Sequence, residues 1–272
     1  MSIRIWHQSF TVLENLPAYA QALAAHFASV ARVGTDVVMH GMHVQTYKTN
    51  YPGTDIRYAA VQALHSSQFV MGGLAAEEQG YDAYAISTIP DVALREVRSL
   101  IDIPVVGYGE SAMLTSCMLG GRFGVLLFIP ELVPQIADNV RRYGLEQRFA
   151  SARHVGFQFN DVLAGFDNPA PLIERFEEAA RALIRDGADV IIPGEAPLCV
   201  LLAKNKVSRV DDAPVIDALG ANIKMAEALV DLKRICGVST SRRGYYMERP
   251  PRERIAELLE FYGLAKLKPA QS

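Results

Sequence analysis

The sequence has little cysteine, no strong excess of either charge sign and no long apolar run. Its three cysteines, Cys117, Cys199 and Cys236, stand far apart and form no Cys-x-x-Cys pair. This spacing argues against a disulfide framework and against a structural zinc site. It indicates a reducing compartment, and we expect the cytoplasm.

The charge balance and the shortness of the apolar runs exclude further classes. The net charge is −3, from 27 basic and 30 acidic residues, whereas nucleic-acid-binding proteins concentrate Lys and Arg to hold phosphates. No segment approaches the ~18 uninterrupted apolar residues of a membrane-spanning helix. The N-terminus also lacks a basic stretch followed by an apolar run. We therefore expect neither nucleic-acid binding nor membrane insertion.

Short apolar segments alternate with longer segments of helical period, which is typical of parallel α/β proteins. Strands are expected at residues 3–6, 36–40, 83–87, 105–108, 123–128, 154–157, 190–192 and 215–217. Helices are expected at residues 16–31, 59–78, 111–119, 171–185, 219–233 and 254–264. The length of 272 residues fits one large domain or two smaller ones.

An internal repeat favours two domains. The segments Gly80–Thr88 and Gly187–Glu195 each begin with a glycine, carry Asp two residues later, pass through an apolar strand and end on a polar residue. A proline follows each segment at the same distance, Pro90 in the first and Pro197 in the second, where proline suits the first turn of a helix. The two halves lie roughly 110 residues apart in the sequence.

The repeat also locates a candidate site. Ligands of open parallel sheets bind beyond the carboxyl ends of the strands, where helix N-termini offer free backbone N–H groups. Thr88 and Glu195 stand at two such ends. We therefore expect both residues to approach one ligand from opposite sides of a cleft.

Several segments resemble the aspartate/glutamate/hydantoin racemase superfamily, and the hydantoin racemase branch most of all. The similar segments are Ile103–Met113, Leu119–Val125, residues 187–192, Pro214–Asp217 and Lys224–Leu229. In order and spacing the resemblance covers most of residues 1–235. It implies two pseudo-symmetric parallel-sheet domains, Rossmann-like or flavodoxin-like, with the active site in the cleft between them and no cofactor. The first domain would comprise residues 1–112 with about 218–272, and the second residues 113–217.

The resemblance also assigns the reacting positions. In that family each half supplies a cysteine at a strand end, one to remove a proton from a carbon and the other to deliver one. The matching positions in this sequence are Thr88 and Glu195. Glu195 can act as acid or base, especially if a partly apolar cleft raises its pKa, whereas a threonine hydroxyl is a poor base. His7, after the first strand, is a second titratable candidate.

Seven further residues are expected to bind the substrate around these three. They are Gln8, Ser9, Ser87, Ile89, Tyr108, Glu110 and Ala196. Helix capping is the alternative role for Thr88, Glu195 and Glu110. The spacing of His40 and His43 is weak support for a metal site, and we expect none.

We therefore expect a cofactor-independent enzyme that acts on a small carboxylate or cyclic amide by proton transfer at the carbon next to a carbonyl. A single proton-transfer group suits an isomerase or a decarboxylase better than symmetric racemisation. One alternative is a hydrolase in which Glu195 activates water. Another is a binding protein for small carboxylates. The amphipathic segment at residues 254–264 suggests contact with a neighbouring subunit, and hence a homo-oligomer.

Overall fold

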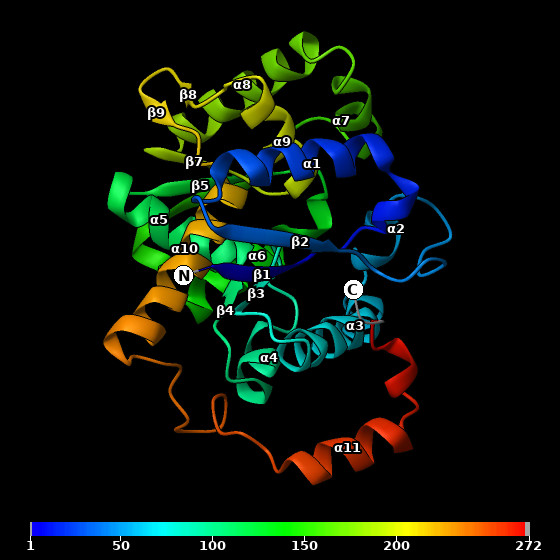
Figure 1. Ribbon diagram of the computed structural model, residues 1–272. Coiled ribbons are helices and arrows are strands. Elements are labelled where there is room, and N and C mark those ends of the chain that lie inside the picture. Colours follow the sequence, from blue (N-terminus) through cyan, green and yellow to red (C-terminus); the bar gives the residue numbers. More distant parts are fainter. Residues whose placement is uncertain (1, 270–272) are drawn as a thin grey trace.

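Two parallel sheets form the centre of the computed structural model, which describes residues 2–269 (Figure 1). Sheet A has the strand order β2-β1-β3-β4, with β1 at Ile3–Gln8, β2 at Thr35–His40, β3 at Ala83–Ile86 and β4 at Val105–Gly107. Sheet B has the order β6-β5-β7, with β5 at Phe123–Leu127, β6 at Phe149–His154 and β7 at Val190–Pro193. The predicted α/β class with two parallel sheets is confirmed.

Helices cover both faces of sheet A, and its central strand β3 is therefore buried on both sides. Every residue of β3 is buried. The helices that pack on this sheet are α1 (Pro17–Val30), α3 (Ala59–Glu78), α4 (Leu94–Leu100) and α10 (Ala218–Cys236). The bounds of α3 agree with the sequence prediction.

Sheet B has its own helices, and α5 connects the two halves. Those of sheet B are α6 (Val133–Arg142), α7 (Phe159–Gly165), α8 (Ala170–Arg185) and α9 (Ala196–Lys204). Helix α5 (Tyr108–Leu119) follows β4 of sheet A directly and packs on both α10 and β7. The residue bounds of the two predicted domains stay a prediction.

The helix expected to start near Pro90 is absent, and this prediction was wrong. After β3 the chain forms a turn in which the Asp91 N–H donates to the Thr88 carbonyl at 2.9 Å. Asp91 and Ala93 both have positive φ, 51° and 58°, which interrupts a right-handed helix. Helix α4 therefore begins only at Leu94.

Two strand predictions also need correction. The strand expected at 154–157 is β6, which ends at His154. It is an edge strand whose side chains are only partly buried, with Ser151 and Arg153 bonded to Asp186, and it therefore lacks a continuous apolar run. The strand expected at 215–217 is reduced to one bridge, between Val215 and Ile191.

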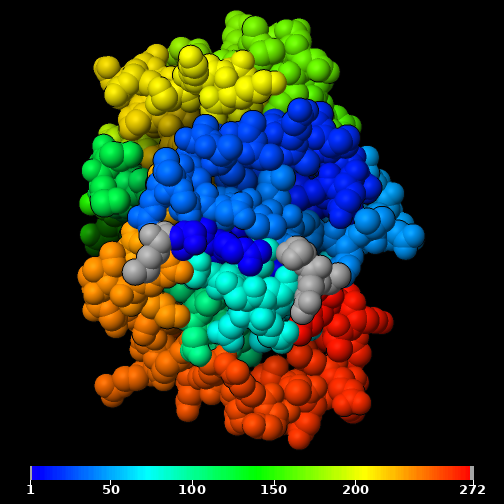
Figure 2. Space-filling model, viewed as in Figure 1, coloured from blue at the N-terminus to red at the C-terminus, as the bar shows by residue number. Residues whose placement is uncertain are grey.

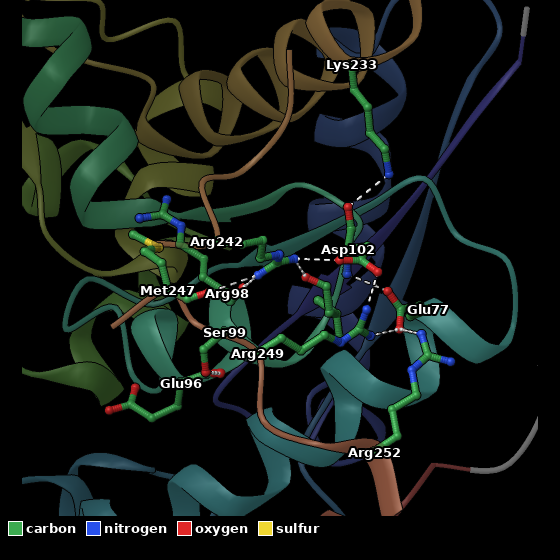
Figure 3. A network of polar contacts seen from close by, with 11 residues as sticks. Glu77, Glu96, Arg98, Ser99, Asp102, Lys233, Arg242, Met247, Arg249 and Arg252 are labelled. Atoms are coloured by element: carbon green, nitrogen blue, oxygen red, sulfur yellow. Dashed lines mark hydrogen bonds and ion pairs between the residues drawn. The ribbon is translucent and has the colours of Figure 1, made fainter. Parts of the chain in front are cut away.

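The C-terminal segment crosses the outside of α3 and α4 and forms α11 (Arg252–Phe261) and then a short 3-10 helix at Ala265–Leu267, coloured orange to red in Figures 1 and 2. The arginines of this segment bind Glu77 of α3 and Asp102 of the turn after α4 (Figure 3). Arg242 donates to Asp102 at 2.8 Å and Arg249 donates to Glu77 at 2.9 Å. No residue of α11 is buried, so charged contacts rather than a core attach this segment. Its contact with another subunit stays a prediction.

Candidate active site

A pocket lies between the carboxyl edges of the two sheets. Its walls are mostly apolar and come from the residues after β1, β3, β5 and β7 and from the segment around α2 (Gly53–Ile56). The apolar part of the lining includes Phe10, Ile56, Ile89, Phe128, Leu132 and Phe159. The space between these walls, including the part open to solvent, is about 470 Å³. A small molecule that entered the pocket would therefore contact both halves of the protein.

Glu195 is a buried carboxyl group in this lining. It is the residue that precedes α9, but its side chain makes no capping bond to that helix. Instead, its carboxylate accepts from the backbone N–H of Phe128 at 3.0 and 3.1 Å and from that of Ile129 at 3.1 Å. The capping alternative is therefore wrong for Glu195, because the carboxylate bridges to the end of β5.

Burial and these hydrogen bonds shift the pKa of Glu195 in opposite directions. Removal from water disfavours the charged carboxylate, whereas the N–H donors favour it. Burial is the stronger effect and raises the pKa of Glu195 from 4.5 to about 8. A carboxyl group with a pKa near neutrality can both accept and return a proton at working pH.

Thr88 lies in the same lining, in the turn after β3. Two side chains of the other half hold this turn. Asn139 of α6 donates to the Pro90 carbonyl at 2.8 Å, and the hydroxyl of Tyr143, directly after α6, donates to Asp91 at 2.6 Å. The Asp91 carboxylate also accepts from Gly109 N–H at 2.9 Å, in the first turn of α5. No helix begins at Thr88, so the alternative role of Thr88 as a helix cap is wrong.

Two further pairs join the halves beside the pocket. The side-chain amides of Gln62 on α3 and Gln135 on α6 bond each other in both directions, at 3.1 and 2.6 Å. Arg57 forms an ion pair with Glu131. Two tyrosines, Tyr19 of α1 and Tyr51 ahead of α2, lie in the lining, and Tyr51 stacks on Phe159 with ring centroids 4.9 Å apart.

His7 lies outside the pocket lining, and its predicted catalytic role was wrong. Strand β1 continues to Gln8, two residues past the predicted end, so the side chain of His7 points into the core against Phe27. It is fully buried, and burial lowers its pKa to about 3. A ring that stays neutral and enclosed at working pH has no route to a ligand.

Three of the expected substrate-binding residues also serve the fold instead. The Gln8 amide donates to the Ser9 and Gly41 carbonyls at 3.2 and 3.1 Å. The hydroxyl of Tyr108 donates to the Pro193 carbonyl at 2.6 Å and so fixes the end of β7. Glu110 pairs with Arg98, outside the pocket.

The remaining expected residues do come together. Ser9, Ser87, Ile89 and Ala196 lie in the lining with Thr88 and Glu195. The Ser87 hydroxyl donates to Asn222 of α10 at 3.3 Å. Cys199 is a buried residue of α9. Burial and the Asp217 carboxylate raise the pKa of its thiol, so it is unsuited as a nucleophile.

Sequence reasoning missed the two pocket tyrosines and the backbone groups that hold Glu195. Nothing in the sequence separates a tyrosine of the core from a tyrosine at a pocket. No metal-binding cluster of three or more His, Cys, Asp or Glu side chains occurs within residues 2–269. In the same range no helix is long and apolar enough to span a bilayer.

The fold and the pocket define a class: a two-halved α/β protein with a small-molecule-sized pocket between two parallel sheets. A family model described as Asp/Glu/hydantoin racemase matches residues 17–226. The hydantoin racemase of Pseudomonas sp. (strain NS671) is 32% identical, over 68% of this chain and 71% of the relative. That of Rhizobium meliloti is 31% identical, over 75% of this chain and 83% of the relative. The chain belongs to the Asp/Glu/hydantoin racemase family, and it is an enzyme.

Solved structures agree with this assignment. The allantoin racemase of Klebsiella pneumoniae superposes with a TM-score of 0.75 at 26% identity, over 92% of this chain and 95% of that one. A glutamate racemase from Francisella tularensis shares the fold, with a TM-score of 0.56 at 14% identity over 89% of this chain and 85% of that one. The architecture predicted from the sequence is therefore also that of solved racemases.

Proposed function

We propose that this protein catalyses proton transfer at the carbon next to a carbonyl of a small, neutral cyclic amide, without a cofactor, and that Glu195 is its acid and base. The observation that carries the proposal is the position of Glu195, a buried carboxyl group with a pKa of about 8 in the wall of a mostly apolar pocket. At pH 7 most molecules hold the protonated form and a minor fraction the carboxylate. Both forms needed for a proton exchange are then present.

The lining favours a neutral substrate over a free carboxylate. No Lys, Arg or His belongs to the pocket lining among the described residues. The N–H groups of Phe128 and Ile129 could hold an anion, but Glu195 occupies them. A substrate carboxylate would therefore find no cationic side chain in the lining and would lie near the Glu195 carboxyl group, which is costly in an apolar site. The related hydantoin and allantoin racemases bear the names of neutral ring compounds.

In the proposed reaction the Glu195 carboxylate removes the proton from the carbon, and the electron pair moves to the carbonyl oxygen. Backbone N–H groups in the first turn of α9, those of Ala196 and Leu198, have no acceptor within the helix. They would stabilise the oxygen as its negative charge develops. Protonated Glu195 then returns the proton to carbon. Because Thr88 is a poor base, one group performs both transfers, and exchange should outpace inversion.

Proton NMR in D₂O tests this proposal. Single enantiomers of 5-monosubstituted hydantoins are incubated with the wild-type protein, Glu195→Gln and Glu110→Gln. We expect deuterium at carbon 5 with the wild type and with Glu110→Gln, and a loss of about 100- to 10,000-fold with Glu195→Gln. Equal exchange with Glu195→Gln would refute the role of Glu195. Ring-opened products without exchange would instead show hydrolysis.

A further inference from the structure

Tyr19 has a hydroxyl group that the fold does not use. It is the third residue of α1, its side chain belongs to the pocket lining and it is 2% exposed. Its phenolic oxygen is buried and has no hydrogen-bond partner among the described residues. A buried hydroxyl without a partner costs free energy, since it has given up water and gained nothing in exchange.

The hydroxyl groups of four other buried or half-buried tyrosines do have partners. The Tyr84 hydroxyl donates to the Phe69 carbonyl at 2.9 Å, and that of Tyr47 donates to the Phe10 carbonyl at 2.7 Å. Tyr108 and Tyr143 likewise bond Pro193 and Asp91. Phenylalanine would fill the place of Tyr19 with the same ring and without the cost. The hydroxyl is therefore unexplained by packing.

The chemistry of this group restricts what it can bind. Burial raises the pKa of Tyr19, so the phenol keeps its proton at working pH and can donate a hydrogen bond. A neutral donor in an apolar wall suits a carbonyl oxygen. It suits that oxygen even better when negative charge develops on it, because bonds to charged acceptors are stronger.

We propose that the Tyr19 hydroxyl donates a hydrogen bond to a ring carbonyl oxygen of the substrate. This inference rests on the proposed function for its ligand class, the neutral cyclic amide. Tyr19 comes from α1, whereas the N–H groups of Ala196 and Leu198 come from α9 in the other half. A ring with two carbonyl groups would then be held from both halves, and its reacting carbon would be fixed relative to Glu195.

Binding of 5,5-dimethylhydantoin tests the inference without any turnover, because this ring has no proton at carbon 5. Its affinity is measured by titration calorimetry for the wild type, Tyr19→Phe and Tyr84→Phe, together with the melting temperature of each protein. We expect Tyr19→Phe to weaken binding about tenfold and to melt at the same or a higher temperature. Tyr84→Phe, which loses a satisfied bond outside the pocket, should melt lower and bind normally.

Two results would overturn the inference: equal affinity of Tyr19→Phe and wild type, or no binding of the ring to the wild type at all. A lower melting temperature of Tyr19→Phe together with normal binding would instead show a structural role. The proposed function is tested separately by deuterium exchange. Binding that depends on Tyr19 without exchange at carbon would refute the reaction and leave the binding role standing.

Discussion

The two halves of the molecule reach the pocket in different ways. In one half, β7 is followed within two residues by Glu195 and α9, so a carboxyl group and free N–H groups stand together at the strand end. In the other half, β3 is followed by the turn at Thr88, and α4 begins only at Leu94. The two copies of the sequence repeat therefore differ at the pocket: in the proposed reaction the half with Glu195 is the reactive side and the half with Thr88 is the supporting side. This asymmetry is what a single-base reaction requires.

The largest expected effect comes from removing the carboxyl group of Glu195. Glu195→Ala should lower deuterium exchange about 1,000-fold, within the usual range for loss of a general acid or base. It would also leave the N–H groups of Phe128 and Ile129 without their acceptor. Added formate should bind there and restore part of the exchange, as NMR rates at rising formate concentration would show. Thr88→Ala, measured in parallel, should show no rescue.

The next largest expected effect is a pH dependence of the free energy of unfolding that comes from Glu195. The pKa of Glu195 is raised from 4.5 to about 8 in the folded protein. The free energy of unfolding is therefore highest, as far as Glu195 is concerned, below pH 4.5, and it falls as the pH rises from 4.5 to 8. Glu195→Gln has no such loss. Urea unfolding at pH 5 and pH 8.5 should show the variant gaining on the wild type by a few kcal/mol at most, since one pKa unit is worth about 1.4 kcal/mol. A constant difference would contradict the raised pKa.

The supporting side should respond through the turn at Asp91. Asp91→Ala removes the acceptor of the Gly109 N–H and the Tyr143 hydroxyl and places alanine at a φ of 51°. We expect a loss of about 2–3 kcal/mol in the free energy of unfolding. Asp91→Asn tolerates positive φ and keeps one acceptor oxygen, but its NH2 group faces the N–H of Gly109 or of Glu110, so it should lose about 1–2 kcal/mol. Equal losses in the two variants would show that the backbone conformation contributes little.

The smallest expected effect is a gain. Thr88→Cys places an ionisable thiol on the supporting side, opposite the acid and base of the other half in the proposed reaction. Inversion of a 5-monosubstituted hydantoin, followed by polarimetry, should rise about tenfold relative to deuterium exchange. Thr88→Ser is the control of similar size and should leave the ratio unchanged. An unaltered ratio in Thr88→Cys would mean that position 88 does not face the reacting carbon.

The parts that sequence reasoning predicted correctly depend on local patterns. Apolar strands such as β3 and β7 and the period of α3 are visible in any short window of residues, and so is the strand-end position of Glu195. The predictions that were wrong depend on contacts between distant residues or on the exact ends of strands. The exit of β1 was placed two residues too early, which turned a core histidine into a catalytic candidate. The partners of Glu195, almost 70 residues away at Phe128, leave no signal in the sequence.

The paired amides of Gln62 and Gln135 constrain how this enzyme can change. Within the pair each side chain donates one hydrogen bond and accepts one, and Gln62 also donates to the Ile56 carbonyl at 3.3 Å, so a substitution of either glutamine removes both bonds between the halves. Asparagine is one methylene too short to restore both bonds. This pair of amides is uncharged, so neither salt nor pH weakens its hydrogen bonds directly, in contrast to the neighbouring ion pair of Arg57 and Glu131. These two positions, on different halves and 73 residues apart, are therefore expected to vary together or not at all.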